Sequence, residues 1–157
     1  MTVYHGGAIA VPNPDLSHSR KAVDFGAGFY VTPILNQAVR WGEKRKRRYG
    51  SAVISKYEYD EVSASALKIL RFDGYSEDWL DFIISCRSGK DKSDYDIVIG
   101  GIANDRVFNT IELYLSKLAT KEETINRLKY EKPNLQINFR TQMIIDGYLR
   151  YEGCERL

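Results

Sequence analysis

Two glycine-marked segments near the N-terminus constrain this chain more than any other feature. A short hydrophobic strand at the N-terminus ends at Tyr4-His5-Gly6. About 25 residues later, a second strand begins at Gly28-Phe29-Tyr30. Glycine leaves an open backbone edge beside the imidazole of His5 and lets a flat group approach the ring of Tyr30 closely. The two segments therefore predict strands that line a pocket for a planar, polar ring.

Length and composition predict an ordinary globular domain over residues 1–157. The chain has 43% hydrophobic and 28% charged residues, and its 157 residues are enough to bury a real core. Cys86 and Cys154 are far apart and lack metal-type spacing, which argues against a disulfide framework or a zinc site. The sequence opens without a signal pattern and has no apolar run near about 18 residues. We therefore expect a soluble, cytoplasmic protein.

Periodicity and capping residues predict an α+β chain with strands at both ends and helices between them. Strands are expected over 2–5, 29–32, 52–59, 66–72 (a strand or a sheet edge), 95–100 and 135–141. Helices are expected over 33–41, 77–87, 107–118 and 121–128, with 143–152 as a helix running into a strand. Ser76 and Thr120 are the expected N-caps of two helices, and Asn104-Asp105 is a turn or cap before a third.

Five stretches together resemble a known family. They are Tyr4-His5-Gly6, the segment from Ser19-Arg20 to Thr32, Gln37-Ala38 with Trp41, residues 95–105, and Gln136-Ile137-Asn138-Phe139-Arg140-Thr141. The chain resembles the bacterial DUF3990 group, which is similar to ADP-ribosyltransferases of the poly-ADP-ribose polymerase branch. That superfamily carries a His, a Tyr and a Glu on three strands, and a second aromatic residue follows the Tyr by eleven positions, where this chain has Trp41. The resemblance implies two packed, mostly antiparallel sheets with an NAD cleft between them and helices outside.

The resemblance also implies site residues. His5, Tyr30 and Gln136 take the catalytic positions, and NAD is expected to bind Tyr4, His5, Gly6, Arg20, Phe25, Gly28, Tyr30, Thr32 and Trp41. Tyr30 and Trp41 can sandwich the nicotinamide ring, whose cationic form is attracted to aromatic faces. The backbone of Gly6 can meet the carboxamide, and His5 can bond a ribose hydroxyl. Arg20 either binds the phosphates or forms a loop salt bridge. The chemistry needs no metal.

Gln136 departs from the superfamily pattern. A neutral amide can bond the ribose but stabilises an oxocarbenium ion less than a carboxylate does, which favours single transfer over polymer synthesis. An alternative alignment puts Asn138 in the Glu position, and it is not acidic either. A non-catalytic module that binds NAD or ADP-ribose is therefore the main competing hypothesis, and NAD-dependent RNA 2′-phosphotransfer on a related fold is a third.

The target and partners stay open at this stage. The run Lys44-Arg45-Lys46-Arg47-Arg48 is either a solvated surface or a phosphate-binding patch for RNA, DNA or an acidic partner. The target macromolecule can equally be a protein. The resembling group occurs in toxin-like and toxin–antitoxin contexts, so a neutralising antitoxin protein and delivery as an effector are expectations of the resemblance. No membrane partner is expected.

Overall fold

Two β-sheets that meet at one point organise the fold. The computed structural model describes residues 1–129 and 132–157, and its sheets have strand orders β1-β3-β7 and β2-β6-β5-β4. Neighbouring strands are antiparallel except β4 and β5, which are parallel. The strands are β1 (Thr2–Gly7), β2 (Phe29–Val31), β3 (Val53–Tyr59), β4 (Ile69–Arg71), β5 (Ile97–Gly100), β6 (Gln136–Phe139) and β7 (Leu149–Arg156).

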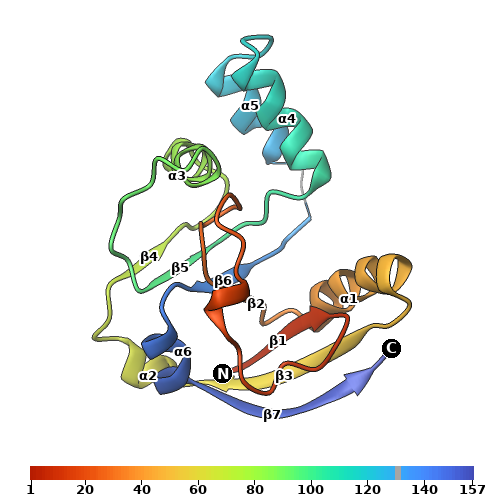
Figure 1. The fold of residues 1–157 in the computed structure, drawn as a ribbon. Helices are drawn as coiled ribbons and strands as arrows, with labels where there is room; N and C mark the ends of the chain where they lie inside the picture. Colours follow the sequence, from red (N-terminus) through yellow and green to blue (C-terminus); the bar gives the residue numbers. More distant parts are fainter. Residues whose placement is uncertain (130–131) are drawn as a thin grey trace.

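The helices lie outside the sheets. They are α1 (Leu35–Tyr49), α2 (Glu61–Ala64), α3 (Glu77–Arg87), α4 (Asp105–Leu115), α5 (Lys121–Leu128) and α6 (Gln142–Tyr148), with one 3-10 turn at Leu16–His18. Figure 1 shows α1 along the three-stranded sheet, and α4 and α5 at the end of the molecule farthest from β7. The predicted mixed α+β class with two sheets is confirmed.

Each face of the four-stranded sheet is covered by its own hydrophobic core. The first core fills the space between the sheets and includes Val3, Phe29, Val31, Tyr57, Tyr59, Ile97, Ile99, Ile137 and Phe139. The second lies under α3, α4 and α5 and includes Phe25, Trp79, Leu80, Ile83, Val98, Val107, Ile111 and Leu128. Because side chains alternate along a strand, Phe29 and Val31 enter the first core, and Tyr30 packs against the second.

Three helices begin at the predicted capping residues. Ser76 accepts from the backbone of Trp79 at the start of α3, and Asn104 accepts from the backbone of Val107 at the start of α4. Thr120 forms the full capping box at the start of α5. Each cap satisfies a backbone donor that the first helical turn leaves unpaired, which explains why these boundaries could be predicted.

The first long helix differs from its prediction. It was expected over 33–41, but α1 begins at Leu35 and continues to Tyr49, and Pro33 precedes it. The added residues are mostly straight-chain Lys, Arg and Glu, which are good helix formers. Basic residues in the last turn complement the negative end of the helix dipole, and Gly50 ends the helix with a left-handed φ of 77°.

Smaller differences occur elsewhere. The four-residue helix α2 was not predicted because it is too short to show helical periodicity, and α4 ends at Leu115 rather than at residue 118. The helix-to-strand reading of 143–152 is confirmed by α6 and β7. Among the described residues, no helix is long and apolar enough to cross a membrane, and no group of three or more His, Cys, Asp or Glu could hold a metal ion.

Candidate functional site

The two sheets touch where β1 passes β2. The N–H of Tyr4 donates to Thr32 O at 2.8 Å, and the N–H of Thr32 donates to Tyr4 O at 2.9 Å, in an isolated bridge. Continued antiparallel pairing would place Gly6 opposite Tyr30. Instead, Nδ1 of His5 lies 2.8 Å from the carbonyl oxygen of Tyr30. The His5 side chain therefore replaces the backbone hydrogen bond that Gly6 would otherwise make to Tyr30. The strands β1 and β2 separate at this point.

The contact with Tyr30 fixes the tautomer of the neutral His5 ring. A carbonyl only accepts, so Nδ1 carries the proton and donates, which leaves Nε2 as a bare acceptor in the neutral ring. The ring stacks on Phe29 with centroids 4.8 Å apart. Burial lowers the pKa of His5, and the charge of Arg45 lowers it further, while the Tyr30 carbonyl acts in the opposite direction. His5 is thus neutral at pH 7, with one nitrogen able to accept from a hydroxyl.

Gly6 lies directly against the backbone of α1. A Cβ at this position would be 2.0 Å from the carbonyl oxygen of Ala38 and 2.8 Å from the nitrogen of Gly42, so no side chain fits. Backbone groups two residues apart on a strand point to the same edge, and those of Tyr4 bond to Thr32. The N–H and C=O of Gly6 therefore point toward the β2 side, where the strands separate. This edge offers one donor and one acceptor.

Helix α1 carries an aromatic residue and a cation on the side that helical spacing turns toward this edge. Trp41 and Arg45 follow Ala38 at helical spacings of three and seven residues, and they share with Gly42 the stripe of α1 that packs on β1. Both side chains are half-buried. In the sequence, Arg45 is recognisable only as one member of a basic run. Arg45 lies four residues after Trp41 and therefore on the same helix face. This spacing is the sequence signal that could have distinguished it from the exposed basic residues of the run.

Tyr30 and Gln136 lie on the opposite face of the four-stranded sheet from His5. The hydroxyl of Tyr30 donates to Gly26 O at 2.6 Å and accepts from the N–H of Phe25 at 3.0 Å. Burial raises the pKa of this hydroxyl far above its ordinary value. The structure thus gathers the predicted residues in two groups: His5 and Gly6 beside α1, and Tyr30 and Gln136 toward the second core. The carbonyl of Tyr30 links the groups through His5.

Gln136 belongs to a buried polar network centred on Asp24. Its Nε2 donates to Oδ2 of Asp24 at 2.9 Å and contacts Gly101 O at 3.3 Å. The other oxygen of Asp24 accepts from Nη2 of Arg87 at 2.5 Å, and Oδ2 also accepts from the N–H of Ala103 at 2.9 Å. A carboxylate therefore stands beside the neutral amide. Asp24 lies within the segment from Ser19-Arg20 to Thr32 that carries part of the family resemblance, and this is the only sequence signal that pointed to it.

Most of the remaining predicted residues are buried within the fold and support the site without facing it. Phe25 and Thr32 are fully buried, and Oγ1 of Thr32 accepts from the N–H of Ile34. A Cβ on Gly28 would lie 1.8 Å from Oδ1 of Asn138, which explains the glycine. Asn138, the alternative to Gln136, is also fully buried.

Arg20 is the exception among these residues, because its side chain is exposed in the loop before β2. It is therefore open to solvent, whereas Phe25, Thr32 and Asn138 lie within the fold.

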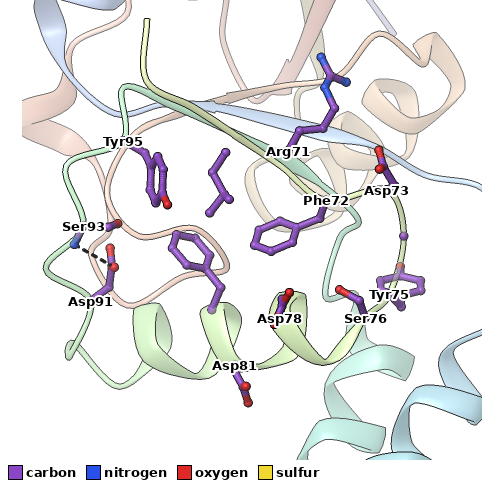
Figure 2. Close-up of a pocket in the computed structure, with 13 residues that line it drawn as sticks. Arg71, Phe72, Asp73, Tyr75, Ser76, Asp78, Asp81, Asp91, Ser93 and Tyr95 are labelled. Atoms are coloured by element: carbon purple, nitrogen blue, oxygen red, sulfur yellow. Dashed lines mark hydrogen bonds between the residues drawn. The ribbon is translucent and has the colours of Figure 1, made fainter.

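A separate hollow of about 790 Å³ lies between β4, α3 and the segment around Ser93 (Figure 2). None of the predicted site residues lines it. Two of its carboxylates are used within the fold, since Asp81 pairs with Lys121 and Asp91 pairs with Arg140. We place the candidate site at the β1–β2 junction because two groups lie there together. They are Nε2 of His5, which can accept a hydrogen bond, and the backbone edge of Gly6, which does not pair with β2.

Comparison with known proteins gives one match. The family model described as a protein of unknown function, DUF3990, matches residues 1–151, which is nearly the whole chain. No curated protein and no solved structure matches.

Proposed function

We propose that this chain, which belongs to the DUF3990 family, is an NAD-dependent mono-ADP-ribosyltransferase with the fold of that superfamily. The observation that carries the proposal is the contact of His5 with the carbonyl of Tyr30, where β1 and β2 separate. It supports a site at the junction of β1 and β2, beside α1, in which one imidazole nitrogen and the edge of Gly6 face a ligand. The resemblance of the motifs around these residues supplies the reaction.

The proposed reaction breaks the bond between the nicotinamide nitrogen and C1′ of the ribose, and the electron pair leaves with nicotinamide. A nucleophilic atom of the target then bonds to C1′ and loses a proton. The products are the ADP-ribosylated target, nicotinamide and that proton. Because charge develops on the ribose, the enzyme's tasks are to hold NAD in a reactive conformation and to stabilise an oxocarbenium-like state.

The geometry suggests a role for each group beside α1. The N–H and C=O of Gly6 bind the carboxamide, and Trp41 supplies an aromatic face for the ring. Nε2 of His5 accepts from a ribose hydroxyl. The guanidinium of Arg45, near His5, suits the diphosphate. Tyr30 acts mainly as a positioning residue, because its carbonyl holds His5 and its hydroxyl holds the loop at Phe25 and Gly26.

The Asp24 network supports single rather than repeated transfer. Gln136 carries no charge, and the carboxylate of Asp24 behind it is paired with Arg87. Gln136 also lies on the opposite face of the sheet from His5, and the charges of Asp24 and Arg87 offset one another, so the network stabilises an oxocarbenium ion at the junction less than an unpaired carboxylate beside it would. We therefore propose slow transfer of one ADP-ribose to a protein or nucleic acid.

One observation favours the alternative of a non-catalytic NAD or ADP-ribose-binding module. Both the amide of Gln136 and the hydroxyl of Tyr30 are already engaged within the fold. A binder needs the junction at His5 and Gly6 but no group that stabilises the oxocarbenium ion.

Nicotinamide release from NAD separates the two functions. Purified protein is incubated with NAD and cell extract, and nicotinamide is measured by chromatography while NAD affinity is measured by calorimetry. The enzyme hypothesis expects release that His5→Gln abolishes, with His18→Gln, a change of the exposed histidine, as the matched control. Binding without release in the parent protein supports the module. No NAD binding at all contradicts both.

We also propose, from the resemblance alone, a toxin-type role with a neutralising partner protein. Expression of the parent chain in a bacterial host should slow growth, and His5→Gln should relieve it. Equal growth of both strains at equal expression would remove this part of the proposal.

A further inference from the structure

Positive charge in this chain is concentrated on α1. Residues 40–48 contain six Lys or Arg and one Glu, whereas the whole chain has 23 basic and 21 acidic residues. The rest of the chain is therefore net acidic. Clustered positive charge on so short a segment produces a positive electrostatic potential. This potential can attract a polyanion to α1 rather than to the rest of the surface.

Four of these cations form one exposed stripe. Arg40, Lys44, Arg47 and Arg48 stand at spacings of four, seven and eight residues, so they share one helix face, and all four are exposed. In the described part of the chain, no carboxylate pairs with Arg40, Arg47 or Arg48. The stripe is thus distinct from Arg45, which lies toward His5.

Helix stabilisation explains only part of this pattern. Cations in the last turn interact favourably with the helix dipole, which accounts for the residues nearest Gly50. Arg40 lies more than two turns before the end of the helix, beyond the range of that effect. The continuation of the stripe to Arg40 is therefore not explained by the helix dipole.

An exposed aromatic ring lies beside the C-terminal end of the stripe, next to Arg48. Tyr49 is 56% exposed, and the guanidinium of Arg48 lies 5.5 Å from the centroid of its ring. Backbone phosphates bind cations, and bases stack on exposed rings and guanidinium planes, whereas an acidic protein surface gains little from Tyr49. Stacking also requires bases that are not paired within a duplex.

We propose that the exposed stripe of α1 formed by Arg40, Lys44, Arg47 and Arg48, together with Tyr49 beside its C-terminal end, binds single-stranded nucleic acid. We call it the α1 basic face. Its binding is independent of NAD turnover, so the proposal stands or falls separately from the proposed enzymatic function. If both hold, the face presents a nucleic-acid target near the junction of β1 and α1.

The test is binding of a dye-labelled single-stranded oligonucleotide, as DNA and as RNA, measured by fluorescence anisotropy across a KCl series without NAD. The triple variant Arg40→Gln, Arg47→Gln, Arg48→Gln should weaken binding by at least about tenfold. The slope of log affinity against log salt concentration should become less negative by up to about 2, since each phosphate contact contributes roughly 0.7 to this slope for single strands. The matched control Lys90→Gln, Lys92→Gln, Arg127→Gln removes the same charge from exposed positions elsewhere.

Tyr49 provides the second measurement. Tyr49→Ala should weaken binding by about 5- to 150-fold with little change in the salt slope, and Tyr49→Phe should bind like the parent. Three results would overturn the proposal: equal losses in both triple variants, tighter binding of a duplex of the same length, or displacement of the oligonucleotide by polyglutamate as effective as by unlabelled oligonucleotide. The last result would favour an acidic protein partner. Circular dichroism checks that each variant is folded.

Discussion

The side-chain amide of Gln136 donates to the carboxylate of Asp24 across 2.9 Å, although the two residues are 112 positions apart in the chain. Because a carboxylate only accepts, the contact fixes which end of the amide is the donor, and Oε1 is directed away from Asp24. Arg87 pairs with the other oxygen of Asp24. The neutral residue at the third motif position is thus one member of a buried charged network.

This contact predicts that Gln136→Glu behaves as an acid with a raised pKa. The introduced carboxyl group lies against Asp24 in a buried setting, so the pair holds a proton to higher pH than in the unfolded chain. The folded variant then binds more protons than its unfolded form above about pH 4.3, and its stability relative to the parent falls as pH rises. Urea unfolding at about pH 4 and pH 7 measures this difference.

Gln142→Glu is the matched control, because the amide of Gln142 also donates to a carboxylate, that of Asp146, but at an exposed position. Solvent screening should leave its difference in stability from the parent nearly independent of pH. If the two variants respond alike, the Asp24 contact is not the cause. While the introduced group holds its proton it adds no charge, so nicotinamide release should not increase at pH 7.

Gly6→Ala is expected to destabilise the fold by about 3 kcal/mol or more, because the added methyl group would overlap the backbone of α1. Gly147→Ala in α6 is the control, since a Cβ there meets nothing within 4 Å. It should be neutral or stabilise by about 0.5–1 kcal/mol, the helix preference for Ala over Gly. Thermal unfolding of both variants checks this. A small loss in Gly6→Ala would mean that α1 shifts easily on β1.

Local chemistry explains why most elements could be predicted from the sequence. The starts of α3 and α5 depend on Ser76 and on Thr120 with Glu123, whose side chains bond to the backbone within one turn. The end of α1 was missed because the basic run was interpreted as a surface feature, although it is also good helix-forming sequence.

The arrangement of the site depends on contacts that no local pattern encodes. Which face of β2 carries Tyr30 follows from pairing with β6, and the neighbours of Gln136 come from segments about 112 and 35 residues away. Asp24 therefore could not be assigned from spacing alone. The glycine of the His-Gly pair was expected to leave room for a ligand, and the structure shows that α1 occupies the space of its side chain.

Tyr30→Phe is expected to cost about 1–3 kcal/mol of folding free energy. It removes the hydroxyl that accepts from the N–H of Phe25 and leaves that buried donor unpaired. NAD affinity should stay close to that of the parent if Tyr30 positions His5 through its backbone carbonyl. Chemical denaturation and NAD calorimetry test the two parts. A large loss of NAD affinity in folded Tyr30→Phe would instead show that the hydroxyl contacts the ligand.

Trp41→Ala is expected to weaken NAD binding by about 1–3 kcal/mol, the range for aromatic stacking of bases, and Trp41→Phe should have a milder effect. The half-buried ring lies on the stripe of α1 that packs on β1. Calorimetric titration with NAD measures the effect, and circular dichroism confirms folding. Unchanged affinity in folded Trp41→Ala would remove Trp41 from the site.

His5 should make both stability and activity depend on pH. Burial lowers its pKa in the folded protein, while the unfolded chain titrates near about 6.5. Between the lowered pKa and about 6.5 the unfolded chain binds more protons, so the free energy of unfolding rises with pH over this range and levels off above it. His5→Gln keeps a donor for the carbonyl of Tyr30 but does not titrate, and it should lose this part of the pH dependence.

Urea unfolding at about pH 5, 6 and 7.5 compares His5→Gln with His18→Gln, which should keep the pH dependence of the parent. An unchanged dependence in His5→Gln would assign it to other groups. Activity should follow the same group, because a protonated Nε2 donates and can no longer accept from a ribose hydroxyl. Nicotinamide release should therefore fall as pH drops through the lowered pKa of His5. Release that stays constant through this range would leave His5 as a residue that joins β1 to β2 without contacting NAD.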